Sequence, residues 1–243
     1  MSKKIITEEI ENHPVVSHEQ WVKARQAFLA KEKKFTKLRD ELSRERRELP
    51  WEKIGKDYVF DGPKGKETLA DLFGDCSQLV VYHFMFDPRW TTGCASCSFW
   101  ADNFNNIPPH LRQRDVTMLA ISRAPLKKLE AFKKRLGWSF KWVSSYGSDF
   151  NYDFHVSFTP AQIKQGRGFY NYREQEIPCA ELPGISVFYK DGGGAIYHTY
   201  SCFARGLDMM NGAYHYLDLT PKGRDEDGLP RRQAWVDYHD KYK

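Results

Sequence analysis

The chain has 243 residues, of which 41% are hydrophobic and 15% aromatic, and its formal net charge is +5. This length and aromatic content support one sizeable core and argue against disorder over most of the chain. The charge is only mildly basic, and Lys and Arg do not alternate with aromatic residues along any stretch, so nucleic acid is not an expected partner.

The start of the sequence and its cysteines point to a compartment. Glu8 and Glu9 stand where a secretory signal would need an apolar stretch. No run reaches the roughly 18 apolar residues of a membrane span. The five cysteines are too few, and odd in number, for a disulfide framework in a chain of this size. We therefore expect a cytoplasmic protein with reduced thiols and no membrane partner.

A long amphipathic helix is predicted for about residues 18–47. Ser17 and Gln20 form a capping-box signature before it, and Pro50 ends the pattern. Its apolar stripe contains residues seven apart, namely Trp21, Phe28, Phe35 and Leu42. Such a stripe needs cover. The favoured cover is the chain's own core, and the alternative is a homodimer contact through this helix.

After Trp51 the pattern changes to short strands, turns and helices. Two continuous apolar runs, 79–86 and 116–122, are typical of strands buried on both faces. Turn signals predict hairpins around residues 58–68 and 185–200. Helices are predicted over 68–73, 98–105, 125–136 and 207–217. Residues 138–158 show no clear periodicity.

The order of these elements predicts the fold. Strands that alternate with helices imply a parallel sheet with right-handed crossovers, and the last hairpin adds antiparallel strands. We therefore expect an α/β fold, a thioredoxin-like three-layer sandwich with a long N-terminal helix and a peroxiredoxin-like N-terminal hairpin. The predicted divisions are an arm and helix over 1–50, a thioredoxin-like domain over 51–220 and a C-terminal tail over 221–243.

The segment Cys94-Ala95-Ser96-Cys97 lies between the first buried strand and a predicted helix. Two cysteines with this spacing can close a small disulfide ring, and backbone N–H groups at a helix start stabilise the thiolate of the first. We expect Cys94 to attack a partner disulfide or oxidant and Cys97 to resolve the mixed disulfide. The expected partner is a protein or small-molecule disulfide or thiol, with no bound cofactor.

Other interpretations of this pair stay open. A zinc site needs two further ligands at close spacing, whereas Cys76, Cys179 and Cys202 are scattered singly, so no metal is expected. The pair could instead be ordinary packing thiols in a non-enzymatic binding module. Peroxide reduction belongs to the same chemistry, but residues 88–94 miss the usual Pro-x-x-x-Thr-x-x-Cys pattern by one position.

Five further residues are candidates for supporting roles. His83 in the preceding strand could accept the proton of the resolving thiol, or could be a core histidine bonded to backbone. Arg89 could lower the pKa of the nucleophilic thiol, and Trp90 could cover it. Arg123 ends the second buried strand, where active sites of parallel sheets gather, and could contact an anion or thiolate. Pro183 precedes the last hairpin and could supply a cis-proline beside the pair.

Several stretches match one bacterial family as a set: 82–86, 90–104, 122–126, 137–140, 144–154, 188–191, 198–200 and 204–206. Over about residues 14–238 the chain resembles the family named domain of unknown function 899, described as predicted dithiol–disulfide oxidoreductases of thioredoxin-like fold. The resemblance implies this fold and a redox role for the cysteine pair, and it implies no substrate. The 144–154 loop either caps the sheet or contacts a substrate.

Overall fold

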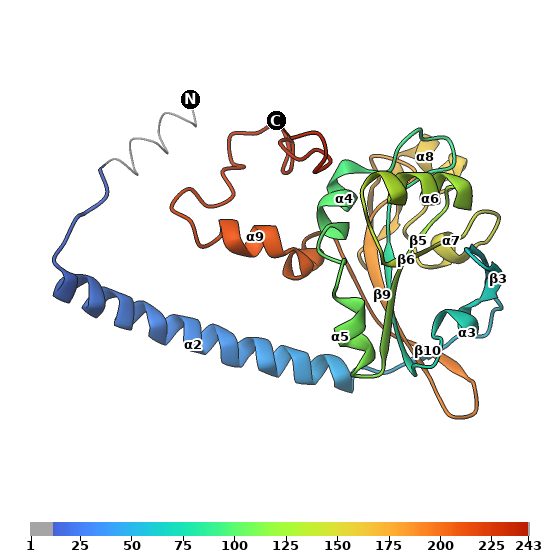
Figure 1. Cartoon of the computed structure of the whole chain (residues 1–243), viewed down its shortest axis with the longest axis horizontal. Helices are drawn as coiled ribbons and strands as arrows, with labels where there is room; N and C mark the ends of the chain where they lie inside the picture. The colour runs from blue at the N-terminus through green and yellow to red at the C-terminus, as the bar shows by residue number, and fades with distance from the viewer. Residues whose placement is uncertain (1–11, 243) are drawn as a thin grey trace. The chain divides into compact units, whose positions relative to one another are not determined.

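The computed structural model describes residues 12–242. These fall into two compact units, one made of residues 12–50 with 217–234 and the other of residues 51–216 with 235–242. The second unit holds the sheet and the cysteine pair (Figure 1). The three-part division expected from the sequence stays a prediction.

The helix of the first unit, α2, spans His18–Glu48, as predicted. The Ser17 side chain accepts the backbone N–H of Gln20, and the Gln20 side chain accepts the backbone N–H of Ser17, so the capping box is complete. None of its residues is buried. Whether its apolar stripe is covered by the chain's own core or by a second copy stays a prediction. Within residues 12–242 no helix is long and apolar enough to cross a membrane.

The second unit is built on a mixed sheet of eight strands in the order β1-β10-β9-β4-β5-β6-β2-β3. β4 is central, parallel to β5 and antiparallel to β9, and β6 continues the parallel part beside β5. β10 pairs antiparallel with β9, with a bulge between His198 and Tyr200. The bounds are β1 Glu52–Lys53, β2 Val59–Gly62, β3 Gly65–Thr68, β4 Gln78–His83, β5 Val116–Ser122, β6 Lys141–Ser144, β9 Gly184–Lys190 and β10 Ile196–Phe203.

The helices and a small second sheet connect these strands. They are α3 Leu69–Leu72, α4 Ala95–Ala101, α5 Pro108–Arg112, α6 Leu126–Arg135, α7 Phe150–Asp153, α8 Pro160–Gln165, the 3₁₀ helix η1 Ala204–Met210 and α9 Gly212–Leu217, with β7 Arg167–Tyr170 and β8 Arg173–Glu176 paired as a hairpin. The β4-α4-β5 unit and the β9-β10 pair meet in the order β5-β4-β9-β10. The expected thioredoxin-like α/β fold and its N-terminal hairpin are therefore confirmed.

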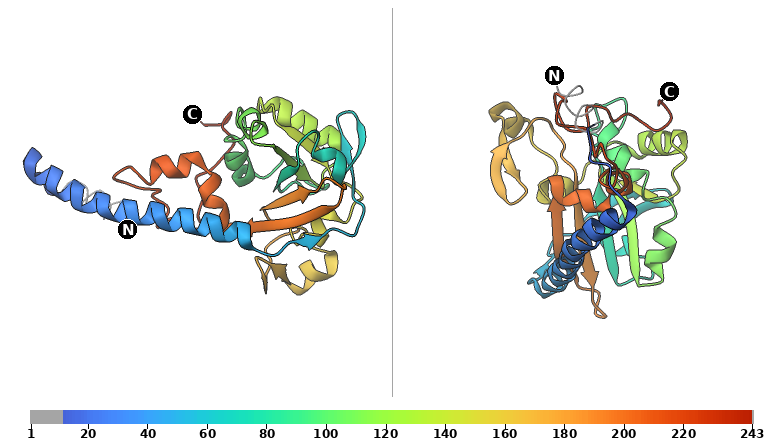
Figure 2. Two further views of the ribbon diagram at one scale, coloured as in Figure 1. Left: turned by 90° about the horizontal axis from the view of Figure 1, so that it is seen from below. Right: turned by 90° about the vertical axis from the view of Figure 1, so that its left-hand side faces the viewer.

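The two faces of the sheet are packed by different helices (Figures 1 and 2). On the face that we call the dithiol face, Tyr82 packs against Phe104 and Phe84 packs against Phe132 of α6. The opposite face, which we call the α7 face, carries a cluster of buried residues from the strands, the N-terminal hairpin, α3 and α7. Because successive side chains of a strand point to opposite faces, β4 supplies both layers.

Three local features differ from the expectation. The segment 138–158 contains β6 and α7, each of only four residues and so too short for a periodic signal. The β7–β8 hairpin was not predicted. The predicted helix 207–217 is divided into η1 and α9, because Asn211 is extended between them.

Candidate active site

The cysteine pair lies at the start of α4, the helix that follows β4 in the chain. Cys94 is the N-cap of α4, with extended backbone angles, and its Sγ accepts the backbone N–H of Cys97 at 3.5 Å. Cys94 is half-buried, whereas Cys97 is only 2% exposed. None of the five cysteines is joined in a disulfide bond. The two sulfurs therefore differ in access, as a nucleophile and a resolving thiol must.

Met85, two residues beyond β4, holds both cysteines. Its carbonyl accepts the backbone N–H of Cys94 at 3.1 Å, and its own N–H donates to Cys97 Sγ at 3.4 Å. An N–H donor favours the charged form of the sulfur that accepts it. The end of the central strand thus fixes the positions of the two thiols relative to each other.

The segment just before Cys94 is held by packing and by the end of the chain. A Cβ at Gly93 would lie 2.8 Å from the Phe84 ring and 3.0 Å from the Phe132 ring, so only glycine fits here. The buried hydroxyl of Tyr238 donates to the Gly93 carbonyl at 2.6 Å. The ring of Trp235 packs edge-on against Phe99 of α4. The sequence signals missed this role of residues 235–242, because an irregular charged segment shows no periodicity.

Burial raises the pKa of Cys97 well above its ordinary value, and the neighbouring Cys94 raises it further. The nearby Tyr82 hydroxyl acts in the opposite direction and lowers this pKa. Tyr82 is fully buried on the dithiol face. Cys97 is therefore a thiol rather than a thiolate near neutral pH, and Tyr82 is a group that acts on it in the direction that favours the thiolate.

His83 does not take the position expected of it. It follows Tyr82 in β4 and so points to the α7 face, away from Cys97. Its ring packs near Phe150, and Nε2 lies 2.8 Å from Ser186 Oγ. Burial lowers the pKa of His83 to about 3, so the ring is neutral at physiological pH. Of the two roles considered for His83, proton acceptor of Cys97 does not fit, because strand alternation places its ring on the other face of the sheet. The alternative of a buried core histidine fits, with the ring bonded to the Ser186 side chain rather than to backbone.

The two arginines are held by carboxylates. Arg89 is exposed and makes a bidentate pair with the buried Asp87, at 2.8 and 3.1 Å. Arg123, which ends the second buried strand as expected, donates to Glu181 at 2.8 Å and lies 3.9 Å from Asp87. Its guanidinium also covers the Tyr152 ring. The role of either arginine toward a thiolate or an anion stays a prediction.

Glu181 and Cys179 are further groups that sequence signals did not single out as a cluster. Burial raises the pKa of Glu181 to about 7, against the opposing effects of Ser157 and Arg123. Cys179 donates its S–H to the Glu181 carbonyl at 3.0 Å. Burial also raises the pKa of Cys179.

The predictions made for Trp90 and Pro183 have different outcomes. Trp90 is half-buried, and its carbonyl accepts Lys128 Nζ at 2.9 Å, while its covering role stays a prediction. The peptide bond before Pro183 is trans, since residues 12–242 contain no cis peptide, so the cis-proline expected there is wrong. The β7–β8 insertion holds this segment instead, with the Tyr170 hydroxyl donating to the Pro183 carbonyl at 2.7 Å.

In the part of the chain that the structure describes, no three His, Cys, Asp or Glu side chains are grouped so that they could hold a metal ion.

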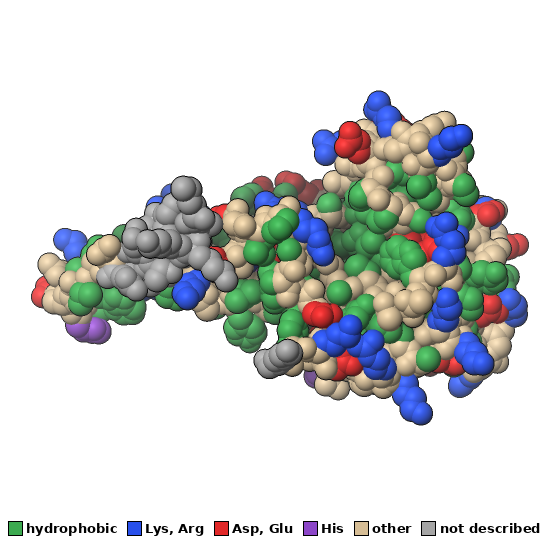
Figure 3. All heavy atoms as spheres, turned by 90° about the horizontal axis from the view of Figure 1, so that it is seen from above, with side chains coloured by type: hydrophobic (Ala, Val, Ile, Leu, Met, Phe, Trp, Pro, Cys, Tyr) green, Lys and Arg blue, Asp and Glu red, His purple; other side chains and the backbone are tan. Residues whose placement is uncertain are grey.

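The face that carries α4, α6 and α8 shows hydrophobic side chains gathered among charged ones (Figure 3).

Comparison with known proteins finds one matching family model and several solved structures of low sequence identity. A family model described as "Bacterial protein of unknown function (DUF899)" matches residues 10–242. PrxQ from Xylella fastidiosa, a cysteine mutant, is 14% identical with a TM-score of 0.41, over 69% of this chain and 96% of that one. Peroxidoxin BcpB from Mycobacterium tuberculosis is 13% identical with a TM-score of 0.40, over 66% and 92%. None of the curated proteins matches.

Proposed function

This chain belongs to the DUF899 family of bacterial proteins, and we propose that it is a dithiol–disulfide oxidoreductase in which Cys94 is the nucleophile and Cys97 the resolving thiol. One observation carries the proposal: Cys94 is half-buried at the N-cap of α4, and its sulfur accepts the backbone N–H of the buried Cys97 at 3.5 Å, while Met85 contacts both residues. This is the arrangement that intramolecular disulfide exchange requires.

The proposed reaction has two exchanges. The Cys94 thiolate attacks one sulfur of a substrate disulfide, forms a Cys94–substrate disulfide and releases the other sulfur as a thiolate. Cys97 then gives up its proton, which ends on a departing thiolate, and attacks Cys94 Sγ. The substrate leaves as a dithiol, reduced by two electrons, and the two cysteines are left oxidised as the Cys94–Cys97 disulfide. A reduced partner thiol regenerates the dithiol by the reverse steps.

The proposed partners are protein or small-molecule disulfides and thiols of the cytoplasm, with no cofactor required. The neutral Ala95 and Ser96 between the cysteines leave thiolate stabilisation to backbone groups and to Tyr82. The hydrophobic side chains on the face of Figure 3 fit contact with a substrate that is itself partly apolar.

Trapping of the mixed disulfide tests the proposal. Cys97→Ser should accumulate one glutathione per chain on Cys94 when treated with glutathione disulfide, because the resolving step is removed. Wild type should release glutathione and lose two hydrogens by mass. Cys202→Ser, which removes a buried thiol on β10, is the matched control and should behave as wild type. The proposal fails if Cys97→Ser traps nothing, or if wild type never forms the Cys94–Cys97 disulfide.

A further inference from the structure

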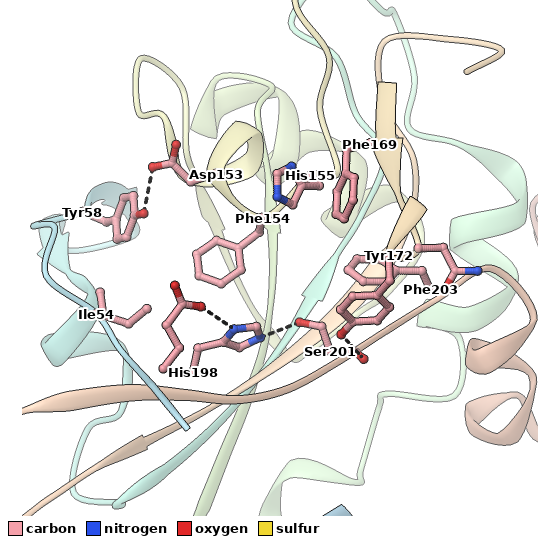
Figure 4. A pocket seen from close by; sticks show the side chains of 12 residues that line it. Ile54, Tyr58, Asp153, Phe154, His155, Phe169, Tyr172, His198, Ser201 and Phe203 are labelled. Carbon is pink, nitrogen blue, oxygen red and sulfur yellow. Dashed lines mark hydrogen bonds and ion pairs between the residues drawn. The ribbon is translucent and has the colours of Figure 1, made fainter. Parts of the chain in front are cut away.

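A second site lies on the α7 face, away from the cysteine pair. It is a cavity of about 300 Å³ between α7, the β7–β8 hairpin and β10 (Figure 4). Five Phe and Tyr rings line it, those of Tyr58, Phe154, Phe169, Tyr172 and Phe203. This volume is at the lower end of the range of small-molecule sites. The proposed thiol chemistry uses none of the residues that line it.

The acidic and basic side chains of the cavity lining are two carboxylates and two imidazoles, those of His155 and His198. Glu52 and Asp153 line it, and no Lys or Arg does so in the part of the chain described by the structure. Asp153 is bonded by Lys56 and by the Tyr58 hydroxyl, both at 2.8 Å, whereas Lys56 is shared with Asp149. Two carboxylates, Asp149 and Asp153, share the Lys56 ammonium, and Glu52 adds a further carboxylate, so with neutral imidazoles this region is formally negative. Glu52, at 78% exposure, carries its charge at the mouth.

A chain of hydrogen bonds fixes the polar floor. His198 Nε2 lies 2.7 Å from Ser201 Oγ, which lies 2.8 Å from Ser186 Oγ, which in turn lies 2.8 Å from His83 Nε2. His83 Nδ1 is buried without a partner. A bare lone pair there costs less than a stranded N–H, so His83 donates through Nε2 to Ser186. His198 Nε2 also lies 3.2 Å from the Tyr200 carbonyl, and its Nδ1 lies 3.5 Å from a carboxylate oxygen of Glu52.

The wall opposite this floor is a turn that demands an unusual backbone. Asn171 and Tyr172 have φ of 52° and 63°, both in the left-handed region, as a two-residue hairpin turn requires. Tyr172 pays a steric penalty there that asparagine and glycine avoid. Its hydroxyl donates to the Ser201 carbonyl at 2.9 Å, and its ring packs on Phe203. The fold therefore holds this ring at the cavity despite local strain.

We infer that this cavity binds a small organic cation, an amine or quaternary ammonium with an apolar body. Aromatic faces attract cations through their negative quadrupole, and the negatively charged carboxylates attract cations as well. The apolar body of the ligand buries against the rings, while the positive head is shared by the rings and Glu52. The same negative surroundings disfavour an anion of equal size. The inference does not depend on the proposed thiol chemistry.

Calorimetric titration of the full chain with three matched probes tests the inference. Benzyltrimethylammonium should bind, benzyl alcohol should bind at least about tenfold more weakly because it lacks the charge, and benzoate should not bind. Equal binding of the alcohol or of benzoate would overturn the inference. So would the absence of binding by the cation up to about 10 mM.

Variants locate the site and separate it from the dithiol. Tyr172→Ala should weaken cation binding about tenfold and Glu52→Gln about threefold, whereas Glu130→Gln, an exposed glutamate of α6, should leave it unchanged. Glu52 is exposed, so its variant is expected to fold. Wild-type affinity in both pocket variants, once circular dichroism shows them folded, would place the cation elsewhere and overturn the assignment. Mixed-disulfide trapping in Tyr172→Ala with Cys97→Ser should be undiminished, so a failure of one proposal is distinguishable from a failure of the other.

Discussion

The two faces of the sheet are built from alternate residues of the same strands, and they hold different kinds of polar group. On the dithiol face Tyr82 presents its hydroxyl to Cys97 within an aromatic layer. On the α7 face its neighbour His83 starts a relay through Ser186 and Ser201 that ends at an open cavity. A step of one residue along β4 thus moves a side chain from one site to the other. Nearness to the cysteines in sequence does not place a group beside them.

The faces also differ in what supports them. The dithiol face is closed over the cysteine loop by Gly93 and Tyr238, groups far apart in sequence. The α7 face rests on Phe150, which contacts Tyr58, Phe60, His83 and Phe154 through their rings. If the faces are separable, changes to one should leave the chemistry of the other intact.

The largest effect is expected from Phe150→Ala on the α7 face. Phe150 is completely buried, so its truncation should lower the free energy of unfolding by about 3–5 kcal/mol. Urea unfolding measures this loss. Phe169→Ala, at the partly exposed rim of the cavity, is the control and should cost less than half as much. Equal losses would mean that Phe150 is not a centre of this face.

On the dithiol face, Gly93→Ala should cost about 1–3 kcal/mol of stability, because the added methyl group must displace the Phe84 or Phe132 ring. The displaced loop should also slow the reaction of Cys94 with glutathione disulfide. Gly192→Ala, where nothing lies within 4 Å, is the matched control and should change neither quantity. An unaffected reaction in Gly93→Ala would show that the loop does not position Cys94.

Opposite pH dependences should separate two buried groups. Burial lowers the pKa of His83 from 6.5 to about 3, so the unfolded chain takes up the proton first, and stability falls as the pH drops through this window. Burial raises the pKa of Glu181 from 4.5 to about 7, so its contribution is present at low pH and is lost as the pH rises through about 7.

Each group should contribute a slope of at most about 1.4 kcal/mol per pH unit. Urea unfolding at a series of pH values should therefore show a weaker acid destabilisation in His83→Gln and a weaker loss toward neutral pH in Glu181→Gln. The two variants should shift the curve in opposite senses. A common shift would mean that neither group titrates in the folded state as its surroundings imply.

The fold and the cysteine pair could be predicted because their signals are local. Buried strands read as continuous apolar runs, and the capping box before α2 spans only four residues. The surroundings of the site could not be predicted in this way. Tyr238 reaches Gly93 across 145 positions, and Arg123 meets Glu181 across 58, through contacts that leave no periodic pattern. The side to which His83 points depended on strand register, which a run hydrophobic at every position does not reveal.

The smallest and sharpest test sets the two neighbours of β4 against each other. Tyr82→Phe removes the hydroxyl that lowers the pKa of Cys97, which should slow resolution of a Cys94 mixed disulfide about fivefold, the equivalent of one hydrogen bond of about 1 kcal/mol. Stopped-flow release of a coloured thiol from Cys94 measures that step directly, and the pH dependence of the rate should move to higher pH. His83→Gln should leave both unchanged, because its ring lies behind the sheet and bonds Ser186. If His83→Gln slows resolution and Tyr82→Phe does not, the proton path runs through the sheet, and the separation of the two faces is wrong.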